Sequence, residues 1–115
     1  MEKAVHATDP EARRFLAALR AFRRGDFSVR ISDDLTGIHA EIADEFNEIV
    51  RLNQLMAKEF RRLSIAVGKE GKIGERGELV PAAGEWKSCI ASVNTLIGDL
   101  VQPATEVGRG VGAVG

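Results

Sequence analysis

The stretch FNEIVRLNQLMAKEF, residues 46–60, sets large apolar residues at helical spacing and places the polar Asn53 among them. A second stretch, VNTLIGDLVQPATEV at residues 93–107, has the same pattern forty-seven positions further along. Apolar residues three and four positions apart lie on one face of a helix. The chain therefore carries one amphipathic helix pattern twice, and the reason for this repetition decides the fold.

Length and composition restrict the class of protein. The chain has 115 residues, enough for one domain or two very small ones. Sixteen basic and seventeen acidic residues leave a net charge of −1, which argues against a nucleic-acid or anionic-lipid surface. We expect no membrane insertion, because no run approaches about eighteen uncharged apolar residues. The single cysteine, Cys89, and the lack of a secretory signal predict a cytoplasmic location.

Capping signals and apolar periodicity predict three helices. The first begins at Thr8 or Asp9, has a proline in its first turn and ends before Gly25. The second covers residues 36–68, and the third begins at about Gly84.

The second and third helices follow one heptad repeat. Two sets of residues in the second helix recur every seven positions, a (Phe46, Asn53, Phe60, Val67) and d (Ile42, Ile49, Met56, Leu63). The third helix continues both sets, with a at Trp86, Val93, Leu100 and Val107 and d at Cys89, Leu96 and Pro103. Charged residues of the second helix avoid both sets, which is typical of a supercoiled bundle. Asn53 either fixes register and parallel pairing or lies at a bundle junction.

Two connectors, residues 25–37 and 71–84, join the helices and have apolar residues of their own. Each is about thirteen residues long and spans roughly 40 Å when extended at about 3.3 Å per residue. That is enough to return along a helix of about sixteen residues, so we predict parallel flanking helices. The residues expected to pack the connectors onto the helices are Phe27, Ile31, Ile73 and Leu79.

The unit of helix, connector and helix recurs about every 46 to 47 residues. We predict a flexible tail at residues 1–8, a first unit at 9–53 and a second at 54–101. Residues 102–115 are interpreted as the start of a truncated third unit, so the chain is expected to come from a longer array.

Several motifs resemble a known family. They include RRGDFSVRI at residues 23–31, LTGIHAEIADEFNEIV at 35–50 with its Phe46-Asn47 pair, and GEWKSCIASVNTLI in the second copy. From about Glu11 onward the chain resembles tandem HAMP domains, the relay modules of histidine kinases, chemoreceptors and related sensors. It is most similar to the poly-HAMP arrays of soluble hybrid histidine kinases. Two departures are the absence of the family's DExG motif and an extra residue before Gly71.

The resemblance implies parallel homodimeric four-helix bundles, all-α, stacked end to end and joined by extended connectors. It also implies a non-catalytic relay that passes helix rotation or tilt to further units and to a histidine kinase-type output domain. The alternative is a structural coiled-coil dimerisation module without switching. Such a module does not require two apolar connectors bounded by glycines.

The residues independently favour a homodimer. Two parallel helices with narrow apolar stripes, supported by five Phe, one Trp and no Tyr, supply little core, and a second copy closes the bundle. The residues predicted to form the dimer core are Phe15, Phe22, Ile42, Phe46, Ile49, Asn53, Met56, Phe60, Leu63, Val67, Cys89, Val93, Leu96, Leu100 and Val107.

No catalytic, cofactor or metal site is expected. The chain shows no nucleophile–base pair, and Cys89 with two distant histidines lacks zinc spacing. Of the histidines, His39 falls on an a position, where a core role is favoured over a pH or ligand role.

Pro103 is expected to act as a junction hinge. The heptad runs unbroken from Leu100 to Val107, so Pro103 is expected to lie inside the third helix, where a proline costs about 3 kcal/mol. We predict a continuous, kinked helix. The alternative is that one helix ends at Gln102 and another starts with Pro103.

Overall fold

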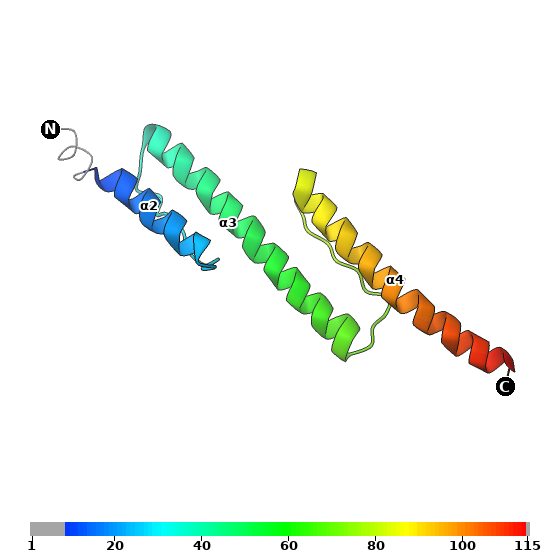
Figure 1. Ribbon diagram of the computed structural model, residues 1–115. Coiled ribbons are helices and arrows are strands. Elements are labelled where there is room, and N and C mark those ends of the chain that lie inside the picture. The colour runs from blue at the N-terminus through cyan, green and yellow to red at the C-terminus, as the bar shows by residue number, and fades with distance from the viewer. Residues whose placement is uncertain (1–8, 115) are drawn as a thin grey trace. The chain divides into compact units, whose positions relative to one another are not determined.

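The computed structural model describes the backbone of residues 9–114 and the side chains of residues 9–101. In this part of the chain the protein is helical and has no strand, which confirms the all-α class. The elements are α2 (Pro10–Arg23), α3 (Gly37–Leu63), the short π-helical segment η1 (Ser64–Lys69) and α4 (Gly84–Val114) (Figure 1). The predicted tail at residues 1–8 and the side chain of Val107 lie outside the described residues.

The caps of α2 lie where the sequence predicts them. The Asp9 carboxylate accepts a hydrogen bond from the Ala12 N–H at 3.0 Å, and Pro10 takes the first helical position. This bond satisfies one of the free N–H groups at a helix start, and it lowers the pKa of Asp9. After Arg24 the chain turns at Gly25, whose φ of 96° favours glycine.

The second predicted helix is present, but its last turns are not α-helical. α3 passes directly into η1, and the Glu70 N–H donates to the Ile65 carbonyl, five residues earlier, at 2.9 Å. A π-turn holds more residues than an α-turn. The widened turns therefore accommodate the extra residue that precedes Gly71.

The chain divides into two compact units between Leu55 and Met56, inside α3. We call the part up to Leu55 unit 1 and the part from Met56 unit 2. The heptad analysis placed this boundary after residue 53, and the third unit expected from residue 102 stays a prediction.

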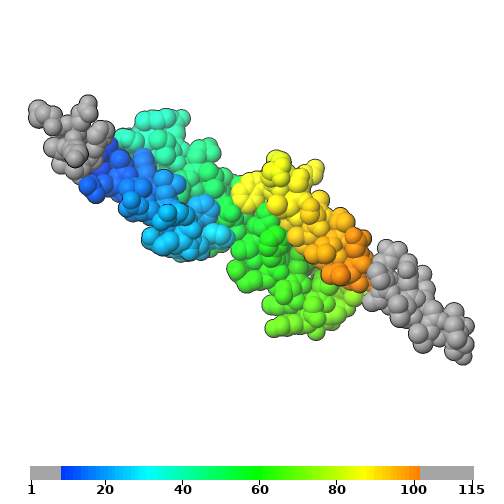
Figure 2. Space-filling model, viewed as in Figure 1, coloured from blue at the N-terminus to red at the C-terminus, as the bar shows by residue number. Residues whose placement is uncertain are grey.

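Within unit 1, α2 and the first half of α3 run parallel, as predicted (Figure 1). The connector runs back from the end of α2 to the start of α3. Ring contacts show the direction: Phe15 lies 5.7 Å from His39, and Phe22 lies 6.2 Å from Phe46, centroid to centroid. Both partners advance by seven residues from one contact to the next, so the helices point the same way. In Figure 2, α2 (blue) lies directly against the start of α3 (cyan). The buried residues of this unit are Ala18, Ile31, Ala43, Phe46 and Val50.

Unit 2 repeats this arrangement with the end of α3, η1, the second connector and α4, again with parallel helices (Figure 1). A Cβ atom at Gly77 would lie 2.9 Å from Leu63 Cδ1 and 3.8 Å from Ile90 Cδ1, so this connector contacts both helices. The buried hydrophobic residues of unit 2 are Met56, Leu63, Ala66, Leu79 and Ile90.

The helix predicted from Gly84 is present as α4. Its backbone is helical through residues 102–104, so no new helix starts at Pro103. The bend expected at Pro103, and its role as a hinge, stay predictions.

Candidate functional site

An asparagine on α3 holds the first connector by its backbone. The Asn47 Oδ1 accepts from the Ile31 N–H at 2.8 Å, and its Nδ2 donates to the Ile31 carbonyl at 2.8 Å. Partly buried backbone groups need such partners, and no neighbouring strand in the described residues supplies them. The carboxamide satisfies both groups of one residue, and we call this pair of bonds a connector clamp.

The same connector clamp occurs in unit 2. The Asn94 Oδ1 accepts from the Gly77 N–H at 2.6 Å, and its Nδ2 donates to the Gly77 carbonyl at 3.0 Å. The sequence analysis noted Asn47 within a motif but assigned no role to either asparagine. Their recurrence forty-seven positions apart, each directly after an a residue, was the available signal.

An arginine stabilises the turn of each connector. Arg30 donates to the Phe27 and Val29 carbonyls at 3.1 and 2.7 Å. Arg76 donates in the same way to the Ile73 and Glu75 carbonyls at 2.9 and 2.7 Å. Each arginine directly precedes the clamped residue, so the turn and the clamp form one fastened element in both units.

The two clamped residues differ in their side chains. Ile31 is 6% exposed and belongs to the core of unit 1, as predicted for connector packing. At Gly77 there is no side chain, and Leu63 of α3 fills the corresponding space. The apolar side chain that the second connector buries is Leu79, two residues later, which is 7% exposed.

Phe27 and Ile73 also differ. Phe27 is half-buried, and its ring lies 5.3 Å from that of Phe22, five residues earlier. Ile73 is 51% exposed within the chain, and its packing onto the helices stays a prediction. The residue five positions before it is Gly68, which offers no side chain to pack against.

Charged groups hold each connector to the first helix of its unit. In unit 1, Arg14 of α2 donates to Ser32 at 2.6 Å and to Asp34 at 2.8 Å, and Ser32 donates to Asp34 at 2.9 Å. The bonds from Arg14 and Ser32 to the Asp34 carboxylate lower the pKa of Asp34. In unit 2, Glu59 accepts from the Glu78 N–H at 2.6 Å, while its partner Arg62 lowers the pKa of Glu59.

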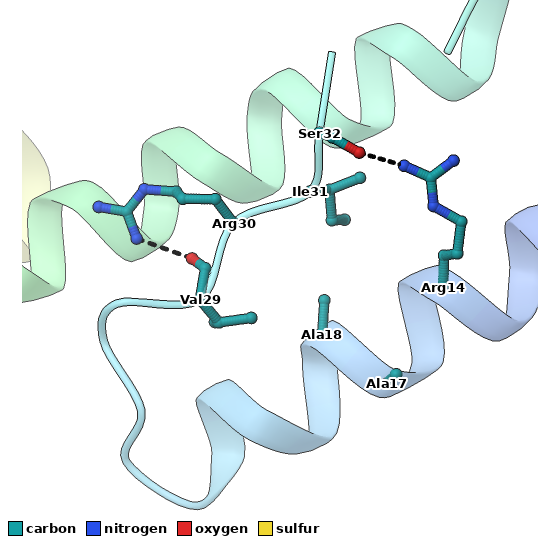
Figure 3. Close-up of a pocket in the computed structure, with 7 residues that line it drawn as sticks. All are labelled: Arg14, Ala17, Ala18, Val29, Arg30, Ile31 and Ser32. Carbon is teal, nitrogen blue, oxygen red and sulfur yellow. Dashed lines mark hydrogen bonds between the residues drawn. The ribbon is translucent and has the colours of Figure 1, made fainter. Parts of the chain in front are cut away.

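A hollow of about 300 Å³ lies between α2 and the first connector (Figure 3). Arg14 and Arg30 flank it, but their guanidinium groups are occupied by Ser32, Asp34 and backbone carbonyls. The rest of its lining is Ala17, Ala18, Val29, Ile31 and Ser32. These side chains include no base beside a nucleophile, so the geometry suits packing better than chemistry.

An apolar face remains uncovered in each unit. In unit 1, Ile38, Ile42 and Ile49 of α3 are 64%, 43% and 47% exposed, and Leu16 and Leu19 of α2 are exposed as well. In unit 2, the exposed apolar side chains of the helices include Phe60, Leu96 and Leu100. Exposed apolar stripes of this kind mark interaction surfaces.

The predicted core residues separate into three groups within the single chain. Those buried are Phe46, Met56 and Leu63. Those half-buried are Phe15, Phe22, Asn53, Val67 and Val93. Those exposed are Ile42, Ile49, Phe60, Cys89, Leu96 and Leu100.

Two polar residues on a positions have local partners. The Asn53 side chain donates to the Ile49 carbonyl of its own helix at 2.8 Å. The His39 ring packs against Phe15. A role for Asn53 in pairing two chains stays a prediction.

The chain matches no known protein-family model and no solved structure at a significant level. Among the described residues, no helix has both the length and the apolar character needed to cross a membrane. The same residues contain no cluster of three or more His, Cys, Asp or Glu side chains suited to a metal ion.

Proposed function

We propose that this chain is a non-catalytic signal-relay module that works as a parallel homodimer, in the manner of the tandem HAMP domains it resembles. The observation that carries the proposal is the same in both units. Two parallel helices are joined by a connector that a carboxamide clamps to the second helix, and an apolar face is left uncovered.

A second copy is the simplest cover for these faces. Each unit supplies two helices, and two copies together supply the four helices of a closed bundle. The exposed d residues Ile42, Ile49 and Leu96 would then become core, as the heptad requires.

A relay explains the connectors better than a scaffold does. A plain coiled coil needs no fastened connector, whereas a bundle that changes helix rotation needs its loops to keep the helices together. α3 belongs to both units, and a helix that shifts in one unit would transmit the change to the next. In the parent protein the partners would be further units and a histidine kinase-type output domain.

The native cysteine tests the dimer directly. Cys89 is exposed in the chain and is expected to face its counterpart in a parallel homodimer. A short bis-maleimide should therefore cross-link two chains efficiently at tens of micromolar. The matched control, Cys89→Ser with Ala91→Cys, moves the thiol to the opposite face of α4 and should cross-link poorly. A single-chain mass by light scattering would refute the proposal.

A second measurement separates the relay from a purely structural dimer. Asn47→Ala and Asn94→Ala loosen the connectors without touching the exposed apolar face. In the parent protein the relay predicts altered output with dimerisation retained. Unchanged output would favour the structural alternative.

A further inference from the structure

The two helices of unit 1 carry opposite charge. α2 has four arginines and one glutamate, a net charge of +3. The part of α3 within unit 1 has four acidic residues (Glu41, Asp44, Glu45 and Glu48) and Arg51, a net charge of −3 with histidine neutral. Neighbouring helices of opposite charge attract each other, so the pattern bears on which helix lies beside which.

Part of this charge is already used inside the chain. Arg14 is paired with Asp34, and Glu48 with Arg51. By contrast, Arg20, Glu41 and Glu45 form no ion pair within the described part of the chain. These three side chains remain available to a partner.

The two unpaired glutamates, Glu41 and Glu45, border the uncovered apolar face of α3. Glu41 and Glu45 line a shallow hollow of about 490 Å³ whose other walls are Ile38, Ile42, Phe46 and Ile49. The two glutamates are four residues apart, so they lie on one side of the helix, next to the isoleucines.

The unpaired basic residue, Arg20, borders the uncovered apolar face of α2. Arg20 lies four residues after Leu16 and directly after Leu19, and both leucines are exposed. The ring contacts set Phe15 level with His39 and Phe22 level with Phe46. By interpolation along the parallel helices, Arg20 lies at the height of residue 44, between the two glutamates.

We propose that α2 of one copy docks on the Glu41/Glu45 face of α3 in a second, parallel copy, with Arg20 paired to these carboxylates. The inference deepens the proposed function and rests on its parallel homodimer. A twofold axis parallel to the helices keeps the heights of both chains equal. Arg20 of each copy therefore meets Glu41 and Glu45 of the other, and the contact forms twice.

A second copy fits this surface better than an unrelated peptide does. The uncovered surface of unit 1 combines a basic apolar strip on α2 with an acidic apolar strip on α3. The partner must present the same two strips in exchanged order and at the same heights. A parallel copy of the chain meets this condition by symmetry.

Charge reversal in two separate chains tests the pairing. Arg20→Glu places like charges at both contacts of its own homodimer, and so does Glu45→Arg. Each homodimer should dissociate about tenfold more readily than the wild type. In the mixed dimer, one contact pairs the two reversed residues, which attract, and the other keeps the native pair. Native mass spectrometry of an equal mixture should therefore find mixed dimers well above the statistical half.

The control is Asp33→Arg, the same charge reversal at an exposed position of the first connector, which does not line this hollow. Its dimer should dissociate within about twofold of the wild type, and circular dichroism should report unchanged helicity for all variants. If the wild type is dimeric but the mixture of the two variants gives only the statistical half of mixed dimers, this pairing is overturned and the homodimer is not. A monomeric wild type would overturn the homodimer and this pairing together.

Discussion

The two connectors are held by equivalent asparagines, Asn47 and Asn94, but different side chains fill the core beside them. In unit 1 the clamped residue, Ile31, places its own side chain in the core. In unit 2 the clamped residue is Gly77, and the helix residue Leu63 occupies the space instead. The clamp acts on a backbone N–H and carbonyl, which every residue except proline has, so Ile31 and Gly77 can both be held in this way. The core can therefore be filled from either the connector or the helix.

The largest difference between the connectors should appear when an isoleucine is replaced by a charge. Ile31→Asp places a carboxylate in the core without a partner, and we expect a loss of about 3–5 kcal/mol in the free energy of unfolding. Ile73→Asp makes the same change in the second connector, where the side chain is 51% exposed, and should cost less than about 1 kcal/mol. Urea denaturation measures both. Equal losses would mean that the two connectors are packed alike.

The asparagines should show how alike the clamps are. Asn47→Ala and Asn94→Ala each leave a part-buried N–H and carbonyl without their partner, at about 1–3 kcal/mol. Gln54→Ala is the control, because Gln54 also bonds the first connector, through Arg30, but at an exposed site. It should change the free energy of unfolding by about 0.5 kcal/mol or less. If Asn47→Ala lowered the free energy of unfolding and Asn94→Ala did not, the clamp would stabilise unit 1 only.

The close approach at Gly77 is specific to unit 2. Gly77→Ala would place a Cβ atom 2.9 Å from Leu63 Cδ1, and we expect a loss of about 1–2 kcal/mol from this overpacking. Gly74→Ala is the matched control, since its Cβ atom would meet nothing within 4 Å. Leu63→Val should shorten the obstructing side chain, so the double variant should lose less than the sum of the single losses. An additive result would contradict the contact.

The smallest effect should come from the exposed pair that holds the first connector to α2. The pKa of Asp34 is lowered in the folded chain, chiefly by its bond to Arg14, so its contribution exists above the unfolded pKa. That contribution is lost as the pH falls from 3.8 through the lower folded-state pKa. The stability difference between wild type and Asp34→Asn should therefore shrink over this window. Arg14→Gln removes the partner, so in that background the further change Asp34→Asn should alter the pH dependence much less.

Local signals predicted the helices well. The N-cap at Asp9, the glycine at residue 25 and the heptad across residues 42–67 depend on residues within a few turns of one another. The helices follow them closely. The recurring asparagine was also visible in the sequence, but not its bond to a connector residue sixteen or seventeen positions earlier.

The sequence by itself determined the helical class, the helix limits, the parallel direction of neighbouring helices and the presence of two similar units. It did so because caps, apolar periods and connector length act locally or set a maximum reach. Only the tertiary structure decided which apolar residues each chain buries. Ile42 and Phe46 share one heptad stripe, yet one is exposed and the other buried, because the neighbouring helix and connector cover one side of the stripe. Likewise, only the packed unit places Leu63 at Gly77, since that contact depends on how closely a connector approaches a helix.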